Sequence, residues 1–253
     1  MLIVNADDVG RSVAETDAAL KCFHAGRITS ASLMVFMHDS ERAAGLAQAA
    51  SLDVGLHLNF TEPFASSRCA PSLVDSQTRL ARFLRRNRYS QLMYNPTLRK
   101  DFAASYSAQA VEFARLFDGA GPSHVDGHHH MHLCANMLLS RLVPSNTKMR
   151  RNFSFWPAEK SWLNRLYRLN VDRWLSRRYR LTEFFFDLSQ SLQFQRLDRA
   201  LGLARTATVE IMSHPIVSAE SEFLLSEPFG TMLQRLEIGS FVTSDRRTKA
   251  VIS

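Results

Sequence analysis

The chain has 253 residues, of which 45% are hydrophobic, so it is long enough to bury the core of a globular α/β protein. Its formal net charge is +7, and basic and aromatic residues concentrate in residues 79–100 and 148–180. Acidic residues at positions 7 and 8 argue against a signal peptide, no apolar run is long enough for a membrane span, and three scattered cysteines argue against a disulfide scaffold or a thiolate zinc site. These features predict a cytoplasmic protein.

Short apolar segments alternate with helical patterns, as in chains built from βα units. Strands are expected at residues 2–7, 29–36, 53–60, 123–130, 208–214 and 240–244. Helices are expected from a capping box at Ser12 and Glu15 to about Gly26, and at residues 39–50, 79–88, 96–118, 134–143, 158–178 and 190–204. This order favours an α/β fold with an irregular, TIM-barrel-like (β/α) barrel of six or seven parallel strands. A single domain is expected over residues 1–253, with 61–100 and 148–180 as insertions or substrate-contact segments.

Two adjacent carboxylates, Asp7 and Asp8, end the first strand just before Gly10. Neighbouring side chains alternate inside a strand, but at its end both can reach the carboxyl edge, where barrels carry their active sites. Their mutual repulsion would be relieved by a cation or a shared proton. The alternative is a helix-capping pair, in which Asp8 stabilises the following helix.

The strand over residues 53–60 places His57 and Asn59 on one face and its large apolar residues on the other. This pattern predicts a polar pocket, although a lone histidine in a strand is more often a satisfied core residue. Late in the chain, Glu210 and His214 share one face at the end of another strand, and Pro215 follows. His214 is therefore a candidate proton donor to a leaving group.

Residues 124–132 hold five of the nine histidines of the chain. Strand alternation would bring four side chains to one face: Asp126, His128, His130 and His132. Such a face favours a metal or proton-transfer site. A catalytic metal usually takes three protein ligands, so the remaining residues would contact the substrate or support the ligands.

Five segments in this order, 5–10, 26–34, 55–58, 126–132 and 210–215, resemble the YdjC-like carbohydrate deacetylases, which include chitooligosaccharide deacetylases. The resemblance covers roughly residues 2–215. It implies an irregular (β/α) barrel that removes an N-acetyl group from an amino sugar. By this resemblance Asp7 is the general base, His214 is the general acid, and the metal ligands are Asp8, His57 and His128.

One divalent ion is therefore expected. One carboxylate and two imidazoles suit Zn²⁺ best, with Mg²⁺, Co²⁺ or Mn²⁺ as alternatives. The residues expected to contact the substrate or support the ligands are Asn59, Asp126, His130, His132 and Glu210. The expected partner is an N-acetylated sugar or glycoconjugate, and the basic segments favour a phosphorylated or lipid-linked one and a location peripheral to the membrane.

Two other functions compete with this interpretation. A metal-dependent hydrolase of another amide or ester would use the same site, but such folds tend to open with a His-x-His pair on the first strand. A basic nucleic-acid-binding protein would use residues 79–100 and 148–180, but it leaves the Asp/His strand unexplained, so no nucleic-acid partner is expected. The oligomeric state stays open, with a homodimer among the alternatives.

Overall fold

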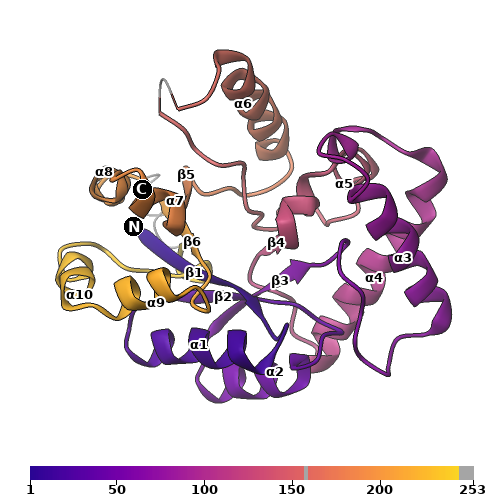
Figure 1. The fold of residues 1–253 in the computed structure, drawn as a ribbon, viewed down its shortest axis with the longest axis horizontal. Helices are drawn as coiled ribbons and strands as arrows, with labels where there is room; N and C mark the ends of the chain where they lie inside the picture. Colours follow the sequence, from indigo (N-terminus) through magenta and orange to yellow (C-terminus); the bar gives the residue numbers. More distant parts are fainter. Residues whose placement is uncertain (157–158, 245–253) are drawn as a thin grey trace. The chain divides into compact units, whose positions relative to one another are not determined.

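The computed structural model describes residues 1–156 and 159–244, which form an α/β fold (Figure 1). Its sheet has six parallel strands in the order β4-β3-β2-β1-β6-β5. The strands are β1 Leu2–Val9, β2 Ser30–Leu33, β3 Asp53–Leu58, β4 Val125–Gly127, β5 Phe184–Asp187 and β6 Val209–Ser213. The predicted α/β class and the parallel strands are confirmed.

The sheet is open within the described residues, because β4 and β5 stand at its two ends. The expected barrel is therefore corrected to an open sheet. Its end strands are short, with three residues in β4 and four in β5, so they offer little edge for further pairing. The strand expected at 240–244 is also absent from this part of the chain, where residues 241–243 form a turn.

The chain divides into two compact units. The terminal unit comprises residues 1–7, 17–31 and the chain from Ser145 onward, and the central unit comprises residues 8–16 and 32–144. Strand β1 crosses the boundary, so Asp7 belongs to the terminal unit and Asp8 to the central unit.

In the terminal unit, β6 pairs in parallel with both β1 and β5, and Val209 stands opposite Leu2 and Phe184. Branched and aromatic side chains suit such buried strands, and Ile3, Phe185 and Ile211 are at most 1% exposed. The helices are α6 Trp162–Ser176, α7 Leu188–Gln193, α8 Leu197–Leu203, α9 Ser218–Leu225 and α10 Glu227–Leu233. The one helix expected over 190–204 is thus two, and β5, α9 and α10 were not predicted.

In the central unit, β3 pairs in parallel with β4, and His57 stands opposite Asp126. Its helices are α2 Ser40–Ala49, α3 Pro71–Leu84, α4 Arg99–Leu116 and α5 Ala135–Ser140, with short 3₁₀ helices η1 Ser90–Leu92, η2 Pro96–Leu98 and η3 His128–Leu133. Helix α3 begins at Pro71, well before the expected start at residue 79, because proline is favoured in the first helical turn. The Phe60 and Phe102 rings pack 5.2 Å apart in the core of this unit.

Helix α1 Val13–His24 begins and ends as expected. At its start the Glu15 N–H donates to Ser12 Oγ over 3.5 Å, and beyond its end Gly26 has a φ of +69°, which favours glycine. No helix in the described part of the chain is long and apolar enough to cross a membrane.

Candidate active site

The first site residue, Asp8, is the penultimate residue of β1, just before the turn at Gly10. Its φ is 64°, a left-handed conformation that aspartate tolerates better than most residues but that still costs about 1–3 kcal/mol. Gly10 follows with a φ of +85°, and a Cβ there would lie 3.0 Å from the Met34 carbonyl oxygen. Strain of this kind is common at functional sites.

The Asp8 carboxylate contacts two histidines within the central unit. Its Oδ1 lies 2.7 Å from His128 Nδ1 and 3.2 Å from His57 Nε2. Burial alone would raise the pKa of Asp8, but the hydrogen bonds and charges of His128 and His57 hold that pKa well below its ordinary value. Asp8 is therefore a carboxylate at neutral pH, as a cation ligand must be.

His57 is oriented by a chain of buried polar groups on β3, β4 and β2. Its Nδ1 lies 2.8 Å from Asp126 Oδ1, and Asp126 Oδ2 accepts a hydrogen bond of 2.7 Å from Ser32 Oγ. Ser32 Oγ also lies 3.1 Å from His124 Nε2. The His124 ring fills the space over Gly55, where a Cβ would lie 2.3 Å from its Cε1 atom. This arrangement fixes the His57 ring and leaves Nε2 directed at Asp8, as in histidine ligands supported by a carboxylate.

Asp8, His57 and His128 fit a divalent metal ion. Each offers one ligand atom, these atoms all lie within 4.8 Å of one another, and all three residues are buried. Within the described residues, the buried His128 Nε2 makes no hydrogen bond, although it lies 3.3 Å from Glu62 Oε1. One carboxylate and two imidazoles form the donor set of many catalytic zinc sites, which keep a further position open.

Glu62, which sequence reasoning missed, adds a second carboxylate beside His128. Asn59 Oδ1 accepts hydrogen bonds from the backbone N–H groups of Thr61 (3.1 Å) and Glu62 (2.9 Å), so Asn59 shapes the loop that carries Glu62. Arg11 donates to both Glu62 carboxylate oxygens, over 3.0 and 2.9 Å. Burial would raise the pKa of Glu62, but His128 and Arg11 lower it below its ordinary value. The only feature of the sequence that pointed to a role for Glu62 was the long connection after β3 in which it lies.

The prediction that one strand face carries Asp126, His128, His130 and His132 is wrong. Strand β4 ends at Gly127, and η3 follows, with His129 and His130 in left-handed conformations at φ 53° and 59°. Alternation therefore stops at His128. His132 is buried with its ring beside Gly127, where a Cβ would lie 3.1 Å from Nδ1. The predicted substrate or supporting roles of His130 and His132 stay predictions.

In the terminal unit, Asp7 belongs to a buried ion triad. Arg150 donates to both Asp7 oxygens over 2.6 and 2.7 Å, and its Nε donates to Glu210 Oε1 over 2.6 Å. Asn5 Nδ2 adds a hydrogen bond of 2.9 Å to Asp7 Oδ1. Arg150 is 0% exposed, with its guanidinium 4.9 Å from the centre of the Phe185 ring. Sequence reasoning named Asp7 and Glu210 but read Arg150 as part of a basic stretch, because its burial has no local signal.

His214 follows β6 in the same unit and is partly exposed. Its backbone N–H donates to Glu220 Oε2 over 2.6 Å, and Ser189 donates to the other Glu220 oxygen. Burial raises the pKa of Glu220. Burial and the charge of Asp7 raise the pKa of Asp187, at the end of β5, whereas His214 and Arg196 oppose the rise. The terminal unit thus gathers titratable groups with raised pKa values, which are typical of functional sites.

Comparisons with known proteins show the family of this chain. The family model of YdjC-like proteins matches residues 1–241. A carbohydrate deacetylase of Mus musculus is 29% identical over 85% of this chain and 77% of its own length, and a chitooligosaccharide deacetylase of Proteus mirabilis is 28% identical over 85% and 81%. A carbohydrate deacetylase of Clostridium beijerinckii is 35% identical, but the match spans 52% of this chain and half (50%) of that protein.

The fold is also found in a solved structure. A suggested cellobiose-phosphate cleavage protein from Enterococcus faecalis superposes with a TM-score of 0.65, at 19% identity, over 96% of this chain and 97% of the other. At this identity the likeness shows the fold alone.

Proposed function

Because this chain belongs to the YdjC-like protein family, we propose that it is a metal-dependent hydrolase that removes the N-acetyl group of an amino sugar. The observation that carries the proposal is the buried cluster of Asp8, His57 and His128, in a chain whose relatives are named carbohydrate and chitooligosaccharide deacetylases. The proposal extends those names to this chain and adds the metal dependence.

In this proposal Asp8, His57 and His128 hold one divalent ion, with Zn²⁺ favoured by the donor set and Mg²⁺ or Co²⁺ as alternatives. A bound ion of this kind lowers the pKa of water to about 7 and polarises a carbonyl group. Asp126 holds the His57 ring in place through Nδ1, and this contact leaves His57 Nε2 to bind the ion. Asp8 supplies the negative charge that the ion requires.

Asp7 is the proposed general base, which accepts the proton of the attacking water. A carboxylate has about four lone-pair sites, so Asp7 can still accept a proton while Arg150 and Asn5 bind its oxygens. Arg150 restricts the rotation of the Asp7 carboxylate, and a fixed orientation of the proton acceptor favours proton transfer.

His214 is the proposed general acid, which protonates the departing amine. Amines leave poorly without a proton, so this step matters for amides and little for esters with acidic leaving groups. The backbone N–H of His214 donates to Glu220 Oε2 over 2.6 Å, which fixes the backbone of His214 at the end of β6.

Replacing His214 with Ala is expected to slow amide hydrolysis by about 10²- to 10⁴-fold and to slow p-nitrophenyl acetate hydrolysis by less than about 10-fold. The measurement is kcat on an N-acetylated sugar and on the ester, with His24→Ala, an exposed histidine of the same unit, as the matched control. Equal losses on both substrates would remove the acid role of His214.

The function itself is tested by acetate release from a panel of substrates. The panel contains N-acetylglucosamine, its short β-1,4 oligomers, N-acetylglucosamine phosphates, a lipid-linked N-acetyl sugar, simple N-acetyl amides and acetate esters. We expect release from N-acetyl sugars, with a preference for phosphorylated or lipid-linked forms because of the basic residues at 79–100 and 148–180. Release only from the non-sugar compounds would support the alternative, a hydrolase of another amide or ester. A preference for neutral oligomers over every anionic compound would refute the expected preference for phosphorylated or lipid-linked substrates, but not the deacetylase activity.

A further inference from the structure

Helix α6, in the terminal unit, turns its apolar side chains outward. Five of its large residues are exposed: Trp162 (68%), Leu163 (60%), Leu166 (44%), Tyr167 (46%) and Leu169 (43%). At 3.6 residues per turn they share one broad face, while Asp172 and Leu175 on the other side are buried. Surface helices usually show the reverse pattern. Contiguous exposed apolar patches are rare in soluble monomers and mark interaction sites.

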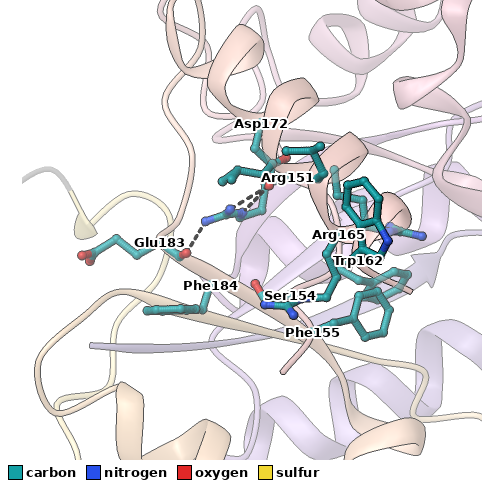
Figure 2. Close-up of a pocket in the computed structure, with 12 residues that line it drawn as sticks. Arg151, Ser154, Phe155, Trp162, Arg165, Asp172, Glu183 and Phe184 are labelled. Atoms are coloured by element: carbon teal, nitrogen blue, oxygen red, sulfur yellow. Dashed lines mark hydrogen bonds and ion pairs between the residues drawn. The ribbon is translucent and has the colours of Figure 1, made fainter. Parts of the chain in front are cut away.

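The outward face continues into a groove between α6, residues 151–155 and β5 (Figure 2). The groove has a volume of about 620 Å³, and its apolar lining comprises Phe153, Phe155, Trp162, Leu166, Leu169 and Phe184. We call the exposed α6 residues and this groove the α6 surface. Every residue of the α6 surface belongs to the terminal unit.

The segment that carries α6 is also strongly basic. Residues 159–178 contain six cations and two acids, Glu159 and Asp172. Both acids are already paired, because Arg196 Nη1 lies 2.8 Å from Glu159 and Arg151 Nη2 lies 2.7 Å from Asp172. The local excess of positive charge is therefore not neutralised by these acids.

Two of these cations remain available to a ligand. The structure gives the Arg165 and Arg173 guanidinium groups no ion pair within the described residues, and Arg165 lines the groove (Figure 2). Burial lowers the pKa of Arg168, whose guanidinium stands 5.2 Å from the centre of the Phe155 ring. An anion at this place would balance the charge and supply the acceptors that the guanidinium groups need.

We propose that the α6 surface docks on an anionic lipid bilayer. Trp162 and Tyr167 suit the level of the headgroups, leucine side chains suit the outer acyl region, and Arg165 and Arg173 suit lipid phosphates. The helix has 15 residues, or about 22 Å, which is shorter than the span of about 20 residues that crosses a bilayer, so it would lie in the plane of the interface.

A lipid surface fits better than a second copy of this chain. In a two-fold contact the α6 surface would face itself, and its positive charges would repel across the interface. A bilayer rich in acidic lipids supplies the opposite charge and an apolar layer at once. This combination matches the interleaved arginine, leucine and aromatic residues of α6.

The test is co-sedimentation of the full chain with vesicles of phosphatidylcholine alone or with phosphatidylglycerol added. We expect binding to the anionic vesicles at least about 10-fold tighter than to the neutral ones, and weaker binding as salt is raised. Leu163→Ser with Leu166→Ser, and separately Arg165→Gln with Arg173→Gln, should each weaken anionic binding by about 10- to 30-fold.

Matched controls use exposed residues elsewhere. Arg205→Gln with Arg235→Gln removes the same charge from the terminal unit, and Val111→Ser removes a 67% exposed apolar residue of α4, so neither should change vesicle binding by more than about 2-fold. Circular dichroism and the thermal midpoint check that each variant is folded.

Three results would overturn the proposal. The first is equal affinity for neutral and anionic vesicles, and the second is that the α6 variants bind vesicles as well as the controls do. The third is that the protein does not bind vesicles and instead forms a dimer in sedimentation velocity, which the α6 variants dissociate. None of these measurements requires turnover, so the docking surface and the deacetylase activity stand or fall separately.

Discussion

Replacing Asp8 with Asn, or His57 or His128 with Ala, is expected to remove the divalent ion and with it nearly all acetate release. The three side chains supply the only protein ligands in the proposed site, and each is buried within the same unit. Loss of a residue that merely supports a ligand already costs about 10- to 100-fold in metal affinity or activity, so loss of a ligand should exceed about 100-fold. The measurement pairs metal content by mass spectrometry with kcat.

Two further variants sharpen this prediction. Asp126→Asn changes only the partner of His57 Nδ1, so it should show the intermediate loss of about 10- to 100-fold. His38→Ala removes an exposed histidine of the same unit and should behave as the wild type. Normal metal occupancy in both His57→Ala and His128→Ala would contradict the ligand assignment.

Replacing Asp7 with Asn is expected to lower kcat by about 10²- to 10⁴-fold while the metal still binds. The amide keeps the shape of the carboxylate and can still accept one hydrogen bond from Arg150, but it cannot take up the proton of water. The measurement again combines kcat with metal content, and the two readouts separate this variant from a lost ligand.

Glu210→Gln is the matched control for Asp7→Asn. Both variants remove one of the two carboxylates that Arg150 holds, so both weaken the same buried triad. Breaking a buried ion pair costs about 3–5 kcal/mol of stability, and the thermal midpoint should fall in both. Only Asp7→Asn should show the loss of about 10²- to 10⁴-fold in kcat. Equal losses of kcat would show that Asp7 acts through the triad and not as a base.

The sequence predicted most of the strands of the fold, but it missed β5 and placed a strand at 240–244 where the structure has none. Alternation and branched apolar residues located β1, β3 and β6, because buried strands carry their signal locally. The Phe-rich strand β5 was missed, since a short apolar run of this kind does not distinguish a strand from a helix. The sequence also could not predict whether the sheet closes into a barrel or stays open, because closure depends on pairing between segments far apart in the chain.

At the candidate site, the sequence named the three residues of the candidate metal cluster but not Glu62 or Arg150. Strand ends and strand alternation marked Asp8, His57 and His128 as candidate site residues, and the resemblance to the YdjC-like deacetylases named them together as metal ligands. His130 could not be placed, because two consecutive left-handed residues break the alternation that the prediction assumed.

Arg150 and Glu62 illustrate a second limit. Arg150 appeared as one cation of a basic stretch, and only its long-range contact with Asp7, 143 positions away, reveals its burial. Glu62 reaches His128 through a loop that Asn59 shapes. Such contacts depend on tertiary structure, so neither composition nor periodicity predicts them.

The most direct test of the account is a zinc titration of chelator-stripped protein, with acetate release from an N-acetylated sugar as the readout. We predict negligible release before zinc is added, a rise to a plateau near about one equivalent, and no recovery by His57→Ala at the same zinc concentration. Full acetate release by the stripped protein, or equal recovery by His57→Ala, would contradict the claim that Asp8, His57 and His128 form the catalytic metal site.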